Sequence, residues 1–557
     1  MRFLDTSSVR TRFDERIPAA DGTELSVDLY FPPKPGRYPI LLNRTAADNN
    51  RAGRPGISLA PAERWKSIAA QGYIVASADV RGRGDSDAKF VPFGNEASDG
   101  ADTLAWLRRL DESNGKVAVF GSGYGGFCAW AAAVADGRVD AIASISPFGA
   151  VGEGLLHRRG AVRLDWLFWM HLIGGRSVQP PSVPPWRSIH QHVPLKTLDE
   201  ALGREDIWWR DWLEHLSPDD PFWQPSQIME RVGALCTPGL HITGWWDGSA
   251  AATYQYYEAA RQGGSPQHLI VGPWDTAATR RPVTKVGGFD FGPRSLIDID
   301  ETLVEFFDHY LRAGMSKKRG ASSRVFVTGR NEWSSTDAWS AALATPLKLH
   351  LSSSFGANTR RGDGVLSGER PMTDSVDMVT HNPARPVEFQ PQFVGFAAGA
   401  ESGFTLDQAH LTSRDEALVY TSAPLETALV VQGRPKISVT VRTTARDVDL
   451  FFLLSDTFPK EVRDLHLSHA AIRLGTLPDF RAGQTIKLEI DLDAIAHEFL
   501  RGHHIRLAVT PSLFPLYARN LQGGDYRGDR ESVIADIELH CGGESGAVLM
   551  LPVIREE

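Results

Sequence analysis

The stretch from Val117 to Ala133 constrains the fold more than any other part of the chain. It reads Val-Ala-Val-Phe-Gly-Ser-Gly-Tyr-Gly-Gly-Phe-Cys-Ala-Trp-Ala-Ala-Ala. The short apolar run is typical of a buried strand, the cluster of glycines predicts a tight corner, and the small residues that follow favour a closely packed helix. The stretch therefore predicts a strand, a turn and a helix in immediate succession.

The glycine corner matches the frame G-x-S-x-G, occupied here by Gly121-Ser122-Gly123-Tyr124-Gly125. In a nucleophile elbow this frame holds a serine hydroxyl clear of a parallel sheet. The apex is Gly123, which has no side chain, so the usual attacking group is missing. Ser122 lies one residue early, and on a tight turn its side chain is expected to point elsewhere. Gly123 also removes the strain that a positive φ imposes on residues with a Cβ.

The same glycines satisfy G-x-G-x-x-G, the fingerprint of dinucleotide binding. That reading requires an acidic residue about 20 positions later, at the end of the following strand. The following strand is expected over 140–146, and it ends in Ser144-Ile-Ser, with Asp140 at its start instead. The pattern therefore disfavours a nucleotide, and we expect no cofactor.

The order of apolar segments predicts an α/β core that is interrupted once. At 557 residues the chain is expected to form more than one domain. Strands alternate with helices up to residue 147 after an opening hairpin over 11–31, and the rhythm resumes after 233, which indicates a parallel sheet with crossover helices. Tryptophan-rich helical segments lie between, and short alternating strands follow. The expected parts are an α/β domain (1–147 and 233–345), a helical cap (148–232) and a jelly-roll β-sandwich (346–557).

Composition and charge limit the classes of molecule that the protein is expected to bind. The formal net charge is −9, without a basic stripe, so nucleic acid is not an expected partner. No run is long and apolar enough for a membrane span, and the first residues lack a signal-peptide pattern, so we expect a cytoplasmic protein that does not enter membranes. The three cysteines are widely spaced and predict neither a disulfide framework nor a metal site. The expected partners are therefore a small-molecule substrate and, in a possible homo-oligomer, further copies of the same chain.

Several further stretches resemble the cocaine-esterase-like (CocE/NonD) hydrolases, relatives of the X-prolyl dipeptidyl aminopeptidases, glutaryl acylases and α-amino-acid ester hydrolases. The resemblance covers nearly the whole chain and implies an α/β-hydrolase core, a helical cap and a carboxyl-terminal jelly roll. The matching stretches include Asp79-Val-Arg-Gly-Arg-Gly-Asp-Ser86, Gly244-Trp-Trp-Asp-Gly248, Gly272-Pro-Trp274, Phe289-Asp-Phe-Gly292, Gly433-Arg-Pro435 and Asp447-Val-Asp-Leu450.

The resemblance also implies where catalytic residues should lie. The family's serine falls on Gly123, its histidine on Thr276 and its oxyanion tyrosine on Ala47, whereas its acid is retained as Asp247. A threonine cannot act as a base near neutral pH, so the serine triad is not assembled. The side chains that are missing should leave additional pocket volume at the elbow.

Candidate site residues follow from these losses. Asp247 and Asp275 are candidate proton carriers, because partial burial suits a carboxyl group to general acid or base work; Asp247 could equally cap a loop. The backbone N–H of Tyr124 is a candidate oxyanion donor. The expected substrate-binding residues are Gly123, Ser122, Ala47, Thr276, Trp246, Trp166, Trp169 and His157.

Three hypotheses follow. The first is a non-hydrolytic or non-covalent enzyme, such as a cyclase, isomerase or lyase, acting on a small acyl, ester, lactone or amide compound. The second is a hydrolase whose catalytic machinery is rebuilt from Ser122, from Cys128 or from a histidine of the cap, His157 or His171. Of these, Cys128 is more simply interpreted as a buried helix residue. The third is a pseudoenzyme that binds a ligand without turnover.

Overall fold

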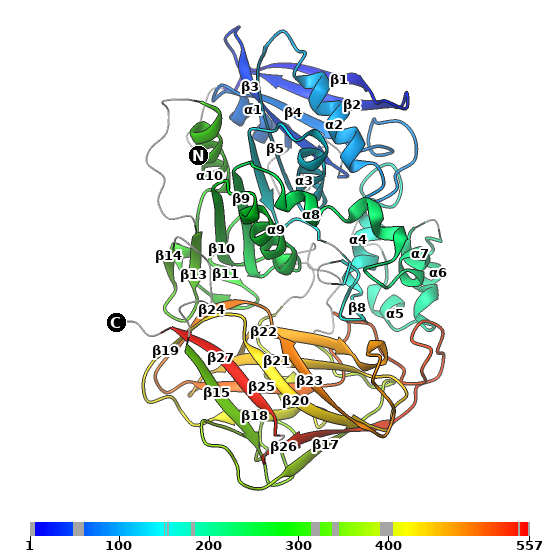
Figure 1. Cartoon of the computed structure of the whole chain (residues 1–557), viewed down its shortest axis with the longest axis vertical. Coiled ribbons are helices and arrows are strands. Elements are labelled where there is room, and N and C mark those ends of the chain that lie inside the picture. Colours follow the sequence, from blue (N-terminus) through cyan, green and yellow to red (C-terminus); the bar gives the residue numbers. More distant parts are fainter. Residues whose placement is uncertain are drawn as a thin grey trace.

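The computed structural model describes residues 6–47, 61–149, 151–152, 155–179, 184–205, 207–312, 323–336, 345–389, 405–543 and 546–554. Figure 1 shows an upper part built of a sheet with helices, a group of short helices at its side, and a β-rich carboxyl-terminal part below. The architecture is an α/β-hydrolase core with a carboxyl-terminal β-domain, as the sequence predicted.

Ten strands of the described chain form the core sheet. Its seven inner strands, from β4 to β13 in the spatial order below, are parallel, whereas the pairs β1–β2, β2–β4 and β13–β14 are antiparallel. The β1–β2 pair is the hairpin expected over 11–31. In spatial order the strands are β1 (Arg10–Pro18), β2 (Glu24–Phe31), β4 (Ile74–Asp79), β3 (Tyr38–Thr45), β5 (Ser113–Ser122), β6 (Ala141–Ile145), β9 (Gly239–Trp246), β10 (Gln267–Asp275), β13 (Ser323–Val327) and β14 (Glu332–Thr336).

Helices cover both faces of this sheet because its strands are apolar on both faces. Along β5, Ala118 and Phe120 join the core under one face, while Val117 and Val119 join the other. The helices are α1 (Pro61–Ala69) and α10 (Ile299–Leu311) on the first face, and α2 (Glu96–Leu107) and α3 (Tyr124–Asp136) on the second, with α9 (Ala250–Gln262) beside β9. The apolar spacing of the sequence also predicts helices over 59–71 and about 299–314, of which residues 59, 60, 313 and 314 lie outside the described ranges.

Short elements between β6 and β9 form a group rich in buried aromatic rings. Trp209 and Trp212 are almost completely buried, so most tryptophans here serve core packing. The elements are β7 (His157–Arg158), β8 (Ala161–Val162), α4 (Asp165–Ile173), α5 (Trp186–His190), α6 (Leu198–Leu202), α7 (Trp209–Glu214) and α8 (Met229–Gly233). In the sequence these segments are interrupted by Pro180-Pro-Ser-Val-Pro-Pro185, of which residues 180–183 lie outside the described ranges.

The carboxyl-terminal part is a sheet of short strands, thirteen of them within the described residues, which are antiparallel except where β16 (Val365–Ser367) pairs with β18 (Leu418–Ser422). Those that matter for the site are β21 (Asp449–Thr457), β22 (Asp464–Arg473), β24 (Ile495–Phe499) and β25 (His504–Thr510). One apolar core runs from Trp245 and Trp246 at the end of β9 into Leu465 of β22. Backbone hydrogen bonds also join Leu164 to Leu516 and Ala518 to Val162. The β-domain is therefore docked directly against the edge of the core sheet where β9 ends.

Candidate functional site

The corner between β5 and α3 has the geometry of a nucleophile elbow. The strand ends at Ser122, the helix begins at Tyr124, and Gly123 between them has φ 57° and ψ −121°. A Cβ on Gly121 would lie 2.2 Å from the carbonyl oxygen of Gly125, and a Cβ on Gly125 would lie 2.9 Å from that of Arg44. Glycine is thus required at 121 and 125 so that strand and helix can approach each other.

Gly123 is different, because space alone does not require it. A Cβ built on Gly123 would have nothing closer than an Arg280 guanidinium nitrogen at 3.3 Å and a ring carbon of Phe148 at 3.5 Å. These are tight but tolerable contacts with side chains. Only the positive φ favours glycine here. The corner therefore keeps the room for a side chain at its apex and lacks the side chain.

Arg280 lies over this apex. It follows the carboxyl end of β10 on a tight turn, and its Nε–H donates to the hydroxyl of Ser122. The side chain is solvent-accessible, yet the surrounding protein lowers the pKa of Arg280 by desolvation. The guanidinium, which stays charged at neutral pH, therefore lies beside the apex on the exposed side of the corner. Sequence reasoning missed Arg280, because an arginine in a turn carries no periodic signal.

Asp247 lies at the end of β9 and bonds Thr276 as the triad positions would. Its Oδ1 accepts from the Thr276 hydroxyl at 2.6 Å and from the backbone N–H of Ser249 at 3.1 Å, and its Oδ2 accepts from the Thr243 hydroxyl at 2.7 Å. Thr276 in turn accepts from the N–H of Gly248 at 3.1 Å. Asp247 is buried and fully bonded, which is the arrangement of a residue that holds two loops together.

Asp275 is less constrained. It is half-buried at the end of β10, and its carboxylate accepts from the backbone N–H of Ala278 at 2.8 Å. Burial raises the pKa of Asp275, and the nearby charge of Asp247 raises it further. Of the two carboxyl groups that the sequence singled out, Asp275 has fewer hydrogen bonds from other side chains within the described residues.

Tyr124 contributes its backbone rather than its ring. Its hydroxyl points into the core, where it donates to Glu96 at 2.6 Å and accepts from the N–H of Phe93 at 2.8 Å. Its own N–H begins α3, where the first helical N–H groups have no partner within the helix. The same buried network includes Cys128, whose thiol lies 3.6 Å from Glu96; burial raises the pKa of Cys128 well above its ordinary value. Cys128 is thus a packed core residue.

An aromatic wall stands beside the apex. Phe148, which follows β6, packs against Trp166 and Trp169 with ring centroids 4.8 and 5.2 Å away, and Trp169 also contacts Tyr124 at 5.6 Å. The structure thus places Trp166 and Trp169 beside the elbow, and their role in binding a substrate stays a prediction. Phe148 is an addition that the sequence could have suggested, because it follows the carboxyl end of a core strand.

The other predicted residues lie farther from this chemistry. His157 accepts from the N–H of Gly160 at Nδ1 and bonds the Leu216 carbonyl through Nε2, so both nitrogens hold the β7 turn in place. His171 is buried edge-on against Trp186. Ala47 is exposed near the end of β3, and its N–H donates to Thr45. Trp246 donates from Nε1 to the His466 carbonyl in the β-domain. Neither histidine is placed as a catalytic base.

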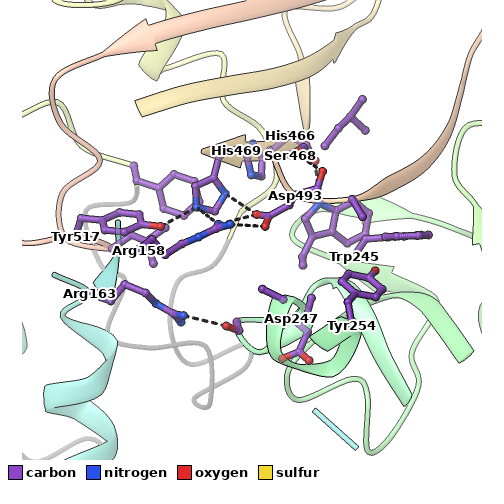
Figure 2. A pocket seen from close by; sticks show the side chains of 18 residues that line it. Arg158, Arg163, Trp245, Asp247, Tyr254, His466, Ser468, His469, Asp493 and Tyr517 are labelled. Carbon is purple, nitrogen blue, oxygen red and sulfur yellow. Dashed lines mark hydrogen bonds and ion pairs between the residues drawn. The ribbon is translucent and has the colours of Figure 1, made fainter. Parts of the chain in front are cut away.

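A hollow of about 660 Å³, including its open mouth, lies between core and β-domain, and Trp246 and Asp247 are among the residues that line it. In Figure 2, Arg158 forms a double hydrogen bond with Asp493 at 2.6 and 2.8 Å, while His469 lies between Tyr517 and Asp493 at 3.0 and 3.4 Å. Burial lowers the pKa of His469 well below its ordinary value. The chain Tyr517–His469–Asp493 is shaped like a proton relay, but the charge of Asp493 is already neutralised by Arg158. We interpret it as a tie between domains.

Two absences hold for the described part of the chain. No three His, Cys, Asp or Glu side chains gather as a metal ion would require. Among the helices that the structure describes, none has the length and apolar character needed to cross a bilayer.

Comparisons with known proteins agree with this architecture. The model of the X-Pro dipeptidyl-peptidase (S15 family) matches residues 21–276, and that of the X-Pro dipeptidyl-peptidase C-terminal non-catalytic domain matches residues 316–549. The cocaine esterase of Rhodococcus sp. (strain MB1 Bresler) is 29% identical over 97% of this chain and 98% of its own. The crystal structure of an α-amino acid ester hydrolase superposes with a TM-score of 0.86 at 24% identity, covering 99% of this chain and 98% of that one. A CocE/NonD family hydrolase from Staphylococcus aureus superposes with a TM-score of 0.70 at 14% identity, covering 98% and 94%.

Proposed function

Because the chain belongs to the cocaine-esterase-like (CocE/NonD) hydrolases, we propose that it is an enzyme of this fold that works without a serine triad. Its reaction is a non-hydrolytic, non-covalent one, of the cyclase, isomerase or lyase type, on a small acyl, ester, lactone or amide compound. The observation that carries the proposal is the pairing of an intact elbow with an apex, Gly123, that has no side chain, beside a Thr276–Asp247 pair that has no imidazole.

The remaining groups suit proton transfer next to a carbonyl. The N–H of Tyr124 at the start of α3 can stabilise the oxygen of an enolate or oxyanion, because a helix N-terminus favours negative charge. Asp275 is the proton carrier, since its carboxyl group is half-buried and its pKa is raised. Asp247 serves as the residue that fixes the Thr276 loop. Substrate carbon atoms lie against Phe148, Trp166 and Trp169.

A rebuilt hydrolase is less well supported. Ser122 gives its hydroxyl oxygen to Arg280, a group that cannot accept a proton at neutral pH. Cys128 is buried against Glu96 and has no access to a substrate. His157 uses both ring nitrogens within its own turn. Each candidate nucleophile or base thus lacks its necessary partner.

A ligand-binding protein without turnover is the second candidate. The observation in its favour is that Asp247, the retained acid, has both oxygens engaged by Thr276, Ser249 and Thr243. These hydrogen bonds give Asp247 a structural role, which is enough to explain its presence without any catalytic role. The two proposals differ in whether Asp275 acts chemically.

The experiment has two arms. A fluorophosphonate probe is expected to leave the wild-type protein unlabelled, and labelling of Ser122 would favour the rebuilt hydrolase instead. In D2O, a panel of esters, lactones and amides with an acidic C–H next to the carbonyl is followed by NMR for deuterium uptake or rearrangement without release of acid.

We expect Asp275→Asn to abolish this exchange and to keep the melting temperature, whereas Asp290→Asn, an exposed carboxylate of β12 (Phe289–Asp290), changes neither. Exchange that persists in Asp275→Asn would contradict the assigned role. A complete absence of exchange across the panel would favour the ligand-binding protein.

A further inference from the structure

Much of the wall of the hollow between core and β-domain is apolar. Its volume of about 660 Å³, open mouth included, lies within the range of small-molecule sites. The indole N–H groups of Trp245 and Trp246 donate to backbone carbonyls at 2.7 and 2.8 Å, so their rings are left to contact an occupant. The larger apolar residues of the lining are Trp245, Trp246, Phe389, Leu467 and Leu516.

A β-bulge turns one strand toward this hollow. Four consecutive residues of β22, from His466 to His469, line it, whereas alternate side chains of a regular strand face opposite ways. The register between β21 and β22 shifts at this point, because Leu454 pairs with Ser468 and the next residue, Ser455, pairs with His466. Bulges re-aim side chains and are frequent next to active sites. The strand is thus shaped to bring His466 and Ser468 to the hollow (Figure 2).

The charged side chains that line the hollow are already paired within the protein. Arg158 binds Asp493 through two hydrogen bonds, at 2.6 and 2.8 Å. Arg163 pairs with Asp165, and Asp247 accepts from three donors. A charged ligand would meet no spare counter-charge among the described lining residues, and burying an unpaired charge is costly. The hollow therefore favours an uncharged ligand.

His466 brings an unsatisfied ring nitrogen to the hollow. Its side chain is 5% exposed, and its Nδ1 has no hydrogen-bond partner within the described part of the chain. Burial lowers the pKa of His466 to about 4, so the ring is neutral at physiological pH and has one donor and one acceptor nitrogen. Buried polar atoms are almost always paired, so this nitrogen indicates a partner that the chain itself does not supply.

A hydroxyl group fits this nitrogen in either tautomer, because a hydroxyl can both donate and accept. Ser468 offers a second point of attachment: its own hydroxyl donates to the Asp493 carbonyl at 2.7 Å, which leaves its oxygen able to accept. A water molecule is a poorer occupant, since it needs several polar partners, and the nearby His469 and Tyr517 are engaged with each other at 3.0 Å.

We propose that this hollow binds a small uncharged compound with one hydroxyl group on an apolar body, such as a phenol or a cyclic alcohol. The hydroxyl bonds Nδ1 of His466, and the rings of Trp245 and Trp246 cover the apolar body. Neither Gly123 nor Thr276 lines the hollow, so this site is separate from the elbow and goes beyond the proposed function. An occupant contacts both the core and the β-domain, and it stabilises the folded chain because it binds that state alone.

The test compares para-fluorophenol with para-difluorobenzene, in which fluorine replaces the hydroxyl group at nearly the same size. Binding to the full-length protein is measured by fluorine NMR, and stabilisation by the shift in melting temperature. We expect para-fluorophenol to bind about fivefold more tightly, which is the net effect of one hydrogen bond. The charged para-fluorobenzoate should compete with para-fluorophenol about tenfold less well than unlabelled phenol does.

Two positions locate the binding. Ala251→Leu fills the hollow from α9 and should remove the binding of both probes. His466→Leu should make the two probes bind equally, whereas His466→Gln, which keeps a donor and an acceptor, should retain part of the preference. His309→Leu is the matched control, because His309 is an exposed histidine of α10, and it should leave both affinities unchanged.

Equal affinities of the two probes for the wild-type protein would overturn the proposal, as would the absence of binding or binding that persists in Ala251→Leu. Circular dichroism verifies that each variant is folded. If Ala251→Leu is not, the comparison of His466→Leu with His466→Gln decides the question. The result is independent of the proposed proton transfer, because Asp275 does not line the hollow.

Discussion

Restoring a side chain at the apex tests how the corner lost its nucleophile. Gly123→Ser places a Cβ at φ 57°, where residues with a side chain are strained by about 1–3 kcal/mol. The steric addition is small, because the nearest atom, 3.3 Å away, is the flexible end of Arg280. Replacing glycine also reduces the entropy of the unfolded chain, which offsets about 0.4–1 kcal/mol. The net loss of stability is therefore expected to be about 1–2 kcal/mol, and the same in Gly123→Ala.

The chemistry of the variant is decided at residue 276. Gly123→Ser alone should remain unreactive toward a fluorophosphonate probe, because Thr276 cannot accept the serine proton. Adding Thr276→His places an imidazole where the threonine hydroxyl now bonds Asp247 at 2.6 Å. A positioned general base contributes on the order of 10²–10⁴ in rate, so the double variant should label faster than Gly123→Ser by that factor.

Gel fluorescence after timed exposure to the probe measures these rates, and denaturant titration followed by tryptophan fluorescence measures stability. The matched control is Gly123→Ala with Thr276→His, which has the imidazole but no hydroxyl and should stay unlabelled. Labelling of Gly123→Ser at the rate of the double variant would refute the reasoning, because a base other than residue 276 would then be present. A loss above about 4 kcal/mol in Gly123→Ala would refute the claim that only backbone strain opposes a side chain there.

Three further predictions concern buried charge and thiol access. Glu96→Gln removes the nearer of the two carboxylates that pair with the fully buried Arg44, Asp99 being the other, and should cost about 3 kcal/mol in denaturant titration; a loss below about 1 kcal/mol would contradict this. Although burial opposes it, Arg158 holds the pKa of Asp493 well below its usual range. Asp493 therefore stabilises the fold above its unfolded pKa of about 3.9, and this contribution is lost as the pH falls through the lower pKa of the folded state. The difference in melting temperature between wild type and Asp493→Asn should be largest near neutral pH and shrink in acid, and a constant difference would argue against the pairing. Iodoacetamide should alkylate the exposed Cys236 in the native protein and spare Cys128 until denaturant is added, as mass spectrometry of peptides can determine.

Local sequence patterns were sufficient to predict much of the α/β core. The strand over 117–121, the corner and the helix after it follow from apolar spacing and glycine content, and the glycines at 121 and 125 have a steric reason that the sequence already implied. The hairpin around Gly22, whose φ is 85°, is a similar case. These features depend on contacts between residues close in the chain.

The features that sequence reasoning missed depend on contacts between distant residues. Arg280 reaches Ser122 across 158 positions, and its direction is set by a turn without periodicity. The hollow in Figure 2 exists because β22 docks against the loop after β9, so Asp493 meets Arg158 across 335 positions. The spacing of residues within a short stretch of sequence cannot predict a contact between residues so far apart in the chain. The boundaries placed at 147, 232 and 345 also remain predictions.

The distinction between stability and function can be drawn from hydrogen bonding alone. Asp247 and His157 were both singled out by type, and each has its polar atoms satisfied by neighbours that need it for local structure. Asp275 is the reverse: it is half-buried, and its carboxylate accepts a hydrogen bond from the backbone N–H of Ala278 rather than from another side chain in the described part of the chain. Burial raises the pKa of this carboxyl group, so the fold holds an ionisable side chain in surroundings that disfavour its charged form. Stability does not account for such a group, whereas the proton transfer proposed for Asp275 does.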